Sequence, residues 1–462
     1  MQRLSATALV LVSISAAVIL CGLGQCAVLS PRPGTGMFLM LSDVHFDPYA
    51  DPAIIRQLGA EPLPACQAPA SGEFSKFGSD SNYPLLKSTL DEAVATARQN
   101  HIHYDYVIVT GDLLAHNFDT RYQRCVGGAP EAYGKFASDT VRFVDAMMIQ
   151  AFPGVPIFAT LGNNDTDHGD YVDASREFLA AVGQDWGRTW SNVSAGRRQA
   201  ALDSFARAGN YALPQPNVPN NELIVINTNL WVARKTQACS EADPDPAGQF
   251  HWLEGVLDKS RRAGRSASLI MHVLPGIDAM KSSGGTPRAF WTDSCTRKFI
   301  DLLTDFRGVV REMYAGHIHR DDFRLLPDRD GKPLSAIHIA PAVSPVYFDN
   351  PAVEIGWYDK SGGALRDYAT LALDLGSAKP AWRLEYLFSQ AYGHSRADLA
   401  TMEELSWQIR NPRSGASRKY ADYYGAGVNV FLTPDNWSNY ACAQTEITPA
   451  AFAQCRDAGA GQ

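Results

Sequence analysis

Five short segments of the chain gather oxygen and imidazole donors. They are SDVHFDP (42–48), GDLLAHN (111–117), GNNDTDHGD (162–170), MHVLPG (271–276) and GHIHRDD (316–322). Asp, Asn and His are the side chains that bind borderline divalent cations such as Zn2+, Mn2+ or Fe2+. A single D-x-H or G-D pair occurs by chance in many chains, and a lone His is usually structural. The five segments together therefore predict a metal site.

The candidate metal ligands in these segments are two carboxylates, one amide and four imidazoles: Asp43, His45, Asp112, Asn163, His272, His317 and His319. A carboxylate can bridge two ions about 4 Å apart, and such ions clamp the attacking and leaving oxygens of an in-line displacement at phosphorus. They also lower the pKa of the water between them. Glycines before three of the ligands let the backbone turn sharply toward the metals. These residue types therefore predict hydrolysis of a phosphate ester.

Each segment follows an apolar run of the kind that forms a buried strand. MFLMLSD (37–43) and YDYVIVTGD (104–112) are two such runs, and residues 84–100 between them repeat apolar side chains with the helical period. Further runs are VPIFATLGNND, ELIVINTNL, SASLIMHV and VVREMYAGHIH, each ending in Gly, Asn, Asp or His. This alternation predicts an α/β fold whose polar groups collect beyond the strand ends.

The chain of 462 residues is longer than one core usually supports, so we expect a large domain plus an appendage. After about residue 378 the composition shifts to aromatic and helix-like stretches such as AWRLEYLFSQAYG. The predicted organisation is a targeting segment over 1–27, a catalytic domain over 37–378 and a small, mostly helical C-terminal domain over 379–462.

Net charge and missing motifs exclude several classes of function. The chain has 41 Lys and Arg against 49 Asp and Glu, a net charge of −8, so it is not a non-specific nucleic-acid binder. There is no G-x-S-x-G elbow, P-loop or dinucleotide fingerprint to support serine hydrolysis, nucleotide cycling or nicotinamide redox chemistry. No segment after the N-terminus approaches about 18 consecutive apolar residues, so no transmembrane partner is expected.

The N-terminus and the cysteines predict export. Arg3 precedes an apolar stretch from Ala6 to Leu20, followed by small residues near Ala27, the pattern of a signal peptide; an uncleaved anchor is the alternative. Six cysteines follow the targeting segment: Cys66, Cys125, Cys239, Cys295, Cys442 and Cys455. They suggest three disulfides, of which pairing in sequence order is the simplest of fifteen arrangements. Asn192 and Asn436 begin formal glycosylation acceptors. The predicted location is secreted or lumenal.

The order D-x-H, G-D, G-N, isolated H and G-H-x-H resembles the calcineurin-like metallophosphoesterase superfamily. Within it, the chain is similar to the acid sphingomyelinase-like phosphodiesterases. That closer likeness rests on SDVHFDPYAD (42–51), on the His four residues after the Asp in GDLLAHN, and on IAPAVSPVYFDNPA (339–352). Tyr347 in the last segment either shapes the substrate cleft or belongs to a simple turn.

The resemblance implies a four-layer α/β sandwich, with two mixed β-sheets flanked by helices and the site at the C-terminal edges of the strands. It implies two divalent metals, normally zinc: one bound by Asp43, His45 and His319, the other by Asn163, His272 and His317, with Asp112 bridging. His116 would hydrogen-bond the substrate phosphate and protonate the leaving oxygen.

Asn164 departs from the superfamily pattern G-N-H-[DE], whose histidine binds phosphate and protonates the leaving group. An amide donates a hydrogen bond but delivers no proton. We expect His116 to take the acid role, because its place in the Asp112 turn puts it beside the metals. Alternatively His168 folds back, the leaving group needs little help, or activity is lost. Asp165 is expected to orient the loop or to support a ligand histidine.

The predicted function is that of a secreted dinuclear-metal phosphodiesterase, acting on a lipid, a nucleotide or another small phosphodiester. No cysteine-rich saposin-like segment precedes Asp43. We therefore expect the substrate to be a soluble phosphodiester, or a phosphoanhydride such as polyphosphate, at least as much as sphingomyelin. A phosphomonoesterase or polyphosphatase on the same site is the alternative. A secreted binding protein on a decayed fold is less expected, because all seven ligands are present.

Overall fold

The computed structural model describes residues 29–191, 193–235, 238–282 and 285–459. The predicted targeting segment over 1–27 and the acceptor Asn192 lie outside the described residues. Among the helices that the structure describes, none has the length and apolar character needed to cross a bilayer.

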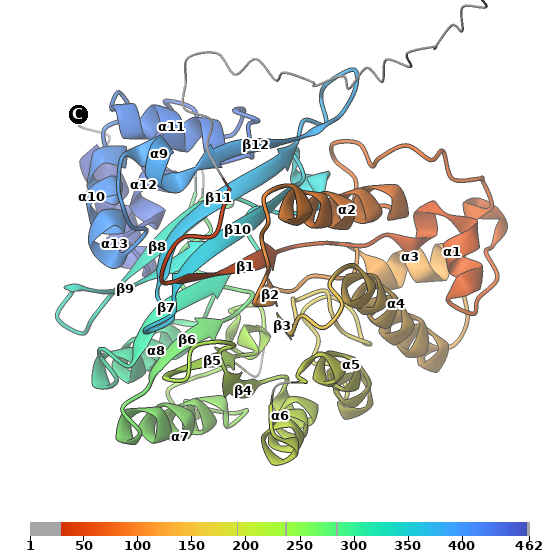
Figure 1. Cartoon of the computed structure of the whole chain (residues 1–462), viewed down its shortest axis with the longest axis horizontal. Helices are drawn as coiled ribbons and strands as arrows, with labels where there is room; N and C mark the ends of the chain where they lie inside the picture. Colours follow the sequence, from red (N-terminus) through yellow and green to blue (C-terminus); the bar gives the residue numbers. More distant parts are fainter. Residues whose placement is uncertain (1–28, 192, 236–237, 283–284, 460–462) are drawn as a thin grey trace, which may run out of the picture.

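Two six-stranded sheets form the centre of the molecule (Figure 1). The first has the order β12-β11-β10-β1-β2-β3 and consists of β1 (Thr35–Leu41), β2 (Tyr106–Val109), β3 (Ile157–Ala159), β10 (Ala352–Asp359), β11 (Leu365–Leu373) and β12 (Trp382–Leu387). The second has the order β4-β5-β6-β7-β9-β8 and consists of β4 (Tyr211–Pro214), β5 (Asn221–Val225), β6 (Ser266–Ile270), β7 (Val310–Ala315), β8 (Asp322–Pro327) and β9 (Pro333–Ile339).

Both sheets combine parallel and antiparallel pairs. In the first, β1, β2 and β3 run parallel and the other neighbours antiparallel. In the second, β5, β6, β7 and β9 run parallel, with antiparallel strands at both edges. The predicted α/β fold with two mixed sheets is confirmed.

Helices flank the two sheets (Figure 1). Those in the first half of the chain are α1 (Pro52–Gln57), α2 (Tyr83–Gln99), α3 (Phe118–Cys125), α4 (Pro130–Ala151), α5 (Arg176–Thr189) and α6 (Ala195–Ala208). Beside the second sheet lie α7 (Gln249–Arg262) and α8 (Asp293–Asp305). The last group, drawn in blue, is α9 (Phe388–Tyr392), α10 (Leu399–Ile409), α11 (Gly415–Tyr423), α12 (Trp437–Ala443) and α13 (Pro449–Gly459). In this group α10 contacts β8 and β9 of the second sheet, whereas α9 contacts β11 and β12 of the first.

The inner faces of the two sheets meet through aromatic side chains. Phe38 of β1 stacks on Tyr106 of β2 with ring centroids 5.2 Å apart, and it meets Tyr314 of β7 edge-on at 5.6 Å. A strand covered on both faces has no solvent side, which is why β1 is apolar almost throughout instead of alternating. The packing brings the carboxyl ends of the parallel strands of both sheets to one region.

The C-terminal segment begins with a strand, not a helix. β12 pairs antiparallel with β11, from Ala369 opposite Leu387 to Leu373 opposite Trp382, and so belongs to the first sheet. The helix-like interpretation of AWRLEYLFSQAYG is therefore wrong for its first half. Apolar and charged residues alternate along WRLEYL, which is the strand period. The division of the chain into domains near residue 379 stays a prediction.

Three disulfides join the six cysteines in sequence order. They connect Cys66 with Cys125, Cys239 with Cys295 and Cys442 with Cys455. The last one ties α12 to α13, and the second anchors a long loop to the start of α8. Disulfides persist in oxidising compartments, so these three bonds agree with the expectation from cysteine number.

Candidate active site

The carboxyl ends of five parallel strands, three in the first sheet and two in the second, deliver the predicted metal ligands to one place. The ligands follow these strands by two to four residues: Asp43 and His45 after β1, Asp112 after β2, Asn163 after β3, His272 after β6, and His317 and His319 after β7. The carboxylates and imidazoles among them belong to three overlapping groups of potential metal donors, one of which also includes His116 beside His45 and His319.

On the β1 side, two imidazoles and a carboxylate converge. The Nε2 atoms of His45 and His319 lie 3.0 Å apart. Asp43 Oδ1 is 3.4 Å from Nε2 of His319 and 3.8 Å from Nε2 of His45. Donor atoms that converge in this way, with all three side chains buried, fit a common cation.

A second group forms around His272. Its Nε2 is 3.1 Å from Asn163 Oδ1, 3.3 Å from His317 Nδ1 and 3.3 Å from Asp112 Oδ2. The same Asp112 oxygen lies 3.4 Å from His45 Nε2 in the first group. Asp112 therefore stands between the two groups, and the donor set fits two divalent ions.

The backbone at five of these residues is left-handed. The φ angles are 48° at Asp43, 43° at His45, 55° at Asp112, 75° at His317 and 59° at His319. Non-glycine residues rarely adopt this conformation, and where they do the surroundings must hold it. Here the backbone amide of Asp43 donates to the carbonyl of Gly111 at 3.1 Å, and that of His45 donates to the carbonyl of Asp112 at 2.8 Å.

Two glycines permit this close packing of turns. Gly111 has a φ of +92°, which L side chains rarely adopt. At Gly162 a Cβ would collide with the backbone and carboxylate of Asp112. The strand-end glycines thus allow the β2 and β3 turns to touch.

Hydrogen bonds on the far side of the ligands fix their orientation. His45 Nδ1 lies 3.0 Å from the carbonyl of Leu114, and His272 Nδ1 lies 2.7 Å from that of Thr110. A proton on Nδ1 in each ring leaves Nε2 free as a metal ligand. The Asn163 amide donates to Asp170 at 2.7 Å, which turns its oxygen toward His272.

Asp165 joins two of the ligand turns, as expected for a residue that orients the loop. One oxygen accepts from the amides of Leu113 and Leu114 at 2.7 and 2.9 Å, and the other accepts from Gly162 at 2.8 Å. Its carboxylate thereby fixes the β3 turn to the β2 turn.

Asn164 faces the carboxylate between the two groups. Its backbone amide donates to Asp112 Oδ1 at 2.8 Å, and its side-chain amide donates to Asp112 Oδ2 at 2.9 Å. The backbone N–H and one side-chain N–H of this buried residue are thus engaged with Asp112. Asn164 therefore holds the carboxylate and has no proton to deliver.

His116 lies beside the first group and has a carboxylate partner that the sequence does not reveal. Its ring stacks on His45 with centroids 4.0 Å apart, and its Nδ1 is 2.8 Å from Asp80 Oδ1. Arg121 donates to the other Asp80 oxygen at 3.1 Å. His116 Nε2 lies 3.3 Å from the hydroxyl of Tyr347. Asp80 comes from a loop without any motif, so nothing in the sequence marks it.

His168 does not reach the cluster. Its side chain is 52% exposed and pairs with the neighbouring Asp167 at 3.0 Å. It does not line the cavity beside the metal ligands, whereas His116 does. Of the two histidines considered for acid catalysis, only His116 has the right position.

Burial and charge divide the cluster imidazoles into two kinds. Burial, aided by the neighbouring His272 or His45, lowers the pKa of His317 and His319 well below the usual range. Burial would also lower the pKa of His45 and His272, but the field of the carboxylates, chiefly Asp112, raises both to about 9. Burial opposes ionisation of Asp112 as well, yet those two histidines hold its pKa well below normal. His317 and His319 are therefore neutral and free to bind a cation, whereas a cation at His45 or His272 must displace a proton from the ring.

A cavity of about 310 Å3 opens beside the cluster. Metal ligands on its wall are Asp112, Asn163, His317 and His319, and other lining residues include His116, Tyr171, Arg234, Lys281, Tyr347, Tyr424, Phe431 and Tyr440. The last three belong to the C-terminal segment, which thus contributes an aromatic wall to the candidate active site.

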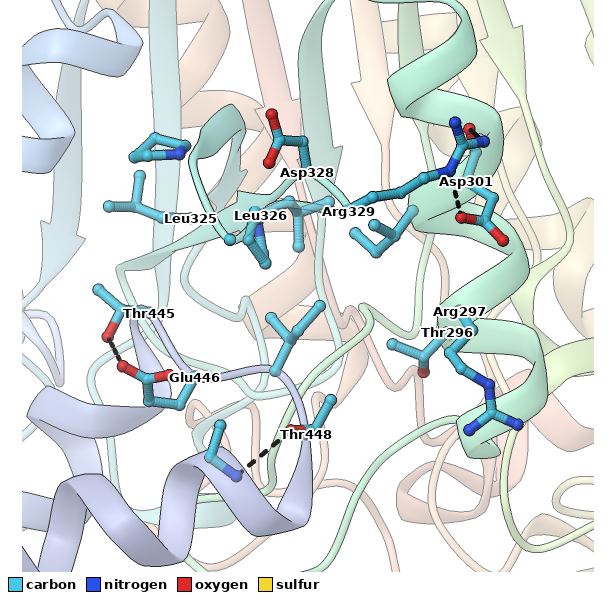
Figure 2. Close-up of a pocket in the computed structure, with 16 residues that line it drawn as sticks. Thr296, Arg297, Asp301, Leu325, Leu326, Asp328, Arg329, Thr445, Glu446 and Thr448 are labelled. Atoms are coloured by element: carbon cyan, nitrogen blue, oxygen red, sulfur yellow. Dashed lines mark hydrogen bonds and ion pairs between the residues drawn. The ribbon is translucent and has the colours of Figure 1, made fainter.

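A larger cavity, of about 640 Å3, lies between α8, the β8–β9 hairpin and the loop from α12 to α13 (Figure 2). Several charges on its rim are paired: Arg329 bonds Asp301 at 2.5 Å, and Glu446 lies 3.3 Å from Arg410. The two cavities share no lining residue. We therefore place the chemistry in the smaller one, which contains the metal donors.

Strand-end donors for two cations on paired mixed sheets define a metallophosphoesterase. The family model described as calcineurin-like phosphoesterase matches residues 37–321, and the chain belongs to this family. It is therefore a metal-dependent phosphoric ester hydrolase.

Curated relatives narrow the likeness to the acid sphingomyelinase-like phosphodiesterases. Human acid sphingomyelinase-like phosphodiesterase 3b is 26% identical, over 92% of this chain and 90% of its own. Human cyclic GMP-AMP phosphodiesterase SMPDL3A is 24% identical, over 92% of this chain and 91% of its own. Sphingomyelinase phosphodiesterase D of Dictyostelium discoideum is 26% identical, over 70% of this chain and 68% of its own. The predicted resemblance is confirmed.

Proposed function

We propose that the chain is an exported phosphodiesterase that works with two divalent ions held by the strand-end cluster. The observation that carries the proposal is the position of Asp112, one oxygen of which lies within 3.4 Å of imidazole nitrogens from both groups. The names of the relatives support a small-molecule or lipid phosphodiester as the substrate.

In this proposal each ion has its own ligands. Asp43, His45 and His319 would hold one, Asn163, His272 and His317 would hold the other, and Asp112 would contact both. Imidazole nitrogens with carboxylate and amide oxygens suit Zn2+, which we take as the metal. Such ions, when bound, neutralise phosphate charge and lower the pKa of a water nucleophile.

His116 would donate the proton to the leaving oxygen. Asp80 engages both the backbone amide and Nδ1 of His116, so the ring orientation is fixed and Nε2 points to the cavity side, toward Tyr347. A general acid must lie within hydrogen-bond reach of the group it protonates, and this nitrogen lies on the cavity wall. Asn164 would keep Asp112 in place.

Asn164 also favours a second candidate, a phosphoanhydride hydrolase on the same site. Its amide bonds Asp112 and cannot assist a poor leaving group with a proton. A phosphate leaving group needs less protonation than an alkoxide, because it is the weaker base.

The first experiment compares bis(p-nitrophenyl) phosphate with p-nitrophenyl phosphate, using the exported form of the protein with zinc and after chelation. Preference for the diester that chelation abolishes supports the phosphodiesterase. Preference for the monoester would replace it with a phosphatase. Turnover that survives complete chelation would contradict the metal-dependent mechanism.

Export is proposed from the three disulfides together with the N-terminal sequence pattern. The full chain expressed in a secretory host should appear in the medium or lumen with its first residue near 27 or 28. Mass spectrometry of the mature N-terminus tests this. An intact, membrane-bound N-terminus would indicate the anchor instead.

A further inference from the structure

Three segments from different parts of the chain meet at the wall of the cavity beside the cluster. One is the turn after β7, which carries the metal ligand His319. The second is the turn at 345–350, which carries Tyr347. The third is the loop at 424–431 between α11 and α12, which carries Phe431. All three contribute lining residues to the cavity, so its shape depends on how they are held together.

Arg320 lies at the centre of these three segments. Its side chain is only 5% exposed. One terminal nitrogen of the guanidinium donates to the carbonyl of His319 at 3.0 Å, and the other donates to the carbonyl of Tyr347 at 3.0 Å. The first of these nitrogens is also 2.9 Å from Asp349 Oδ1. A rigid, planar fork of donors can make these contacts together, because its nitrogens point in fixed and different directions.

The face of the same guanidinium packs on the C-terminal loop. Its central carbon lies 3.9 Å from the centroid of the Phe431 ring. A cation over an aromatic face is attracted to it, and the attraction is stronger where water is excluded. The loop also meets the second turn, since the Asn350 side chain donates to the carbonyl of Ala426 at 2.9 Å. Arg320 therefore contacts all three segments.

The position of Tyr347 matters to the chemistry because its side chain ends at His116. The hydroxyl lies 3.3 Å from His116 Nε2, the nitrogen from which the proton would leave. The tyrosine ring also meets His319 edge-on, with centroids 4.7 Å apart. Asp80 holds the opposite nitrogen of His116 at 2.8 Å. The imidazole is thus contacted at both ends, and its cavity end depends on where Arg320 places the tyrosine.

We propose that Arg320 is a positioning residue, which fixes Tyr347 against His116 and thereby aligns the proton donor with the leaving oxygen. The inference rests on the proposed function, in which His116 is the acid. Arg320 acts through its neighbours, since its terminal nitrogens bond two carbonyl oxygens and the carboxylate of Asp349. The C-terminal loop contributes through Phe431, which packs on the same guanidinium.

The main variant is Arg320→Lys, which keeps the charge beside Asp349 but cannot contact both carbonyls and the aromatic ring. Arg320→Gln combined with Asp349→Asn is the second variant, because it leaves no buried charge without a partner. Arg261→Lys is the matched control on α7, where the guanidinium lies 4.4 Å from the centroid of Phe306 and pairs with Asp258. Thermal melts and zinc analysis accompany each variant.

Two diesters distinguish alignment of the acid from a general loss of activity. Diphenyl phosphate releases phenolate, a stronger base than the p-nitrophenolate from bis(p-nitrophenyl) phosphate, so it depends more on a proton donor. We expect kcat for diphenyl phosphate to fall about tenfold in both Arg320 variants, with KM within about twofold of the parent value. For bis(p-nitrophenyl) phosphate kcat falls less than about threefold, and Arg261→Lys changes neither value.

A double-mutant cycle with Tyr347→Phe tests whether Arg320 acts through that side chain. Losses from residues that act as a unit do not multiply. Arg320→Lys should therefore lower kcat for diphenyl phosphate less than about threefold in the Tyr347→Phe background. Hydrogen exchange followed by mass spectrometry gives a readout without turnover. Peptides that span 345–350 and 424–431 should exchange about tenfold faster in Arg320→Lys than in the parent.

Equal losses for the two diesters would overturn the inference, because they indicate an effect other than proton donation. Losses that multiply fully in the double variant would overturn it too, and so would exchange in Arg320→Lys that matches the parent in both peptides. A parent protein that hydrolyses bis(p-nitrophenyl) phosphate but not diphenyl phosphate has no effective acid for Arg320 to align, so the inference fails while the proposed function stands. If the parent hydrolyses neither diester with zinc, the proposed function itself fails, and the role in proton donation fails with it.

Discussion

Asp112 has the most demanding position of any single residue in the cluster. It contacts both groups of imidazoles through one oxygen and accepts two hydrogen bonds from Asn164. An amide in its place would keep the shape and lose the negative charge. The consequences of that loss distinguish an enzyme from a binding protein on the same fold.

Asp112→Asn should lower the metal content from two ions per chain and reduce kcat/KM for bis(p-nitrophenyl) phosphate by at least about 100-fold. Metal analysis of the purified protein and steady-state kinetics measure both effects. Asp167→Asn is the control, since this carboxylate pairs with the half-exposed His168 in the next loop. Unchanged metal content and turnover in Asp112→Asn would contradict the dinuclear site.

Asn164→His should restore a proton donor to the position where the superfamily pattern has one. General acid catalysis contributes about 100-fold or more when the leaving group is a strong base, and little when it is a weak one. We therefore expect faster hydrolysis of an alkyl phosphodiester and little change with bis(p-nitrophenyl) phosphate. Asn164→Gln, which has no proton to give, provides the comparison. Equal effects of Asn164→His on both substrates would show that proton donation is not what the position lacks.

The predicted ligands all arrive at one place because their signal is local. Each follows an apolar run, and parallel strands bring their ends to one edge. Asp80 could not be predicted in this way. Its role depends on a contact with His116, 36 residues away, and no local sequence pattern around Asp80 predicts that contact. For His168 the local pattern misleads instead. The residue type and the segment both suit catalysis, but the side chain is directed to solvent.

At the scale of elements, strands were predictable where both faces are covered and difficult where they are not. The runs at 37–43 and 104–112 correspond to β1 and β2, which lie inside the first sheet. β12 is the edge strand of that sheet, and its six residues lie next to a helix. A short edge strand followed by aromatic residues resembles a helical stretch, so the sequence misleads there.

The disulfide between α12 and α13 should stabilise the C-terminal helices. It closes a loop with a sequence separation of 13 residues, and the chain-entropy model gives about 3 kcal/mol for a loop of this size. Replacing Cys442 and Cys455 together by Ser should lower the unfolding midpoint in a thermal melt. Because Tyr440 of α12 lines the cavity, KM should rise as well. A melt identical to that of the parent would show that these helices are held by packing alone.

For the molecule as a whole, buried carboxyl groups away from the metal ligands set the dependence of stability on pH. Burial raises the pKa of Glu312 from 4.5 to about 8. Burial also raises the pKa of Glu385 well above normal, and both its oxygens lack a hydrogen-bond partner among the described residues. Between about pH 4.5 and 8 Glu312 keeps a proton in the folded state that the unfolded chain releases, and the raised pKa of Glu385 acts in the same direction. Stability must therefore fall as the pH rises through this interval.

We expect the thermal midpoint to be highest near pH 5 and to decline toward pH 8. Differential scanning calorimetry in buffers of equal ionic strength measures this trend. Glu312→Gln and Glu385→Gln should flatten the decline, since an amide does not ionise. A midpoint that rises from pH 5 to pH 8 would contradict the account.

The left-handed backbone at five cluster residues restricts which substitutions this site can accept during evolution. Glycine, Asn and Asp tolerate that conformation, whereas β-branched residues are severe outliers in it. A ligand that mutates to Asn or Gly keeps its turn and loses only a donor atom. One that mutates to Val, Ile or Thr distorts the turn and its neighbours too. Inactive descendants that still fold should therefore carry Asn or Gly at Asp43, Asp112 or His319 far more often than β-branched residues.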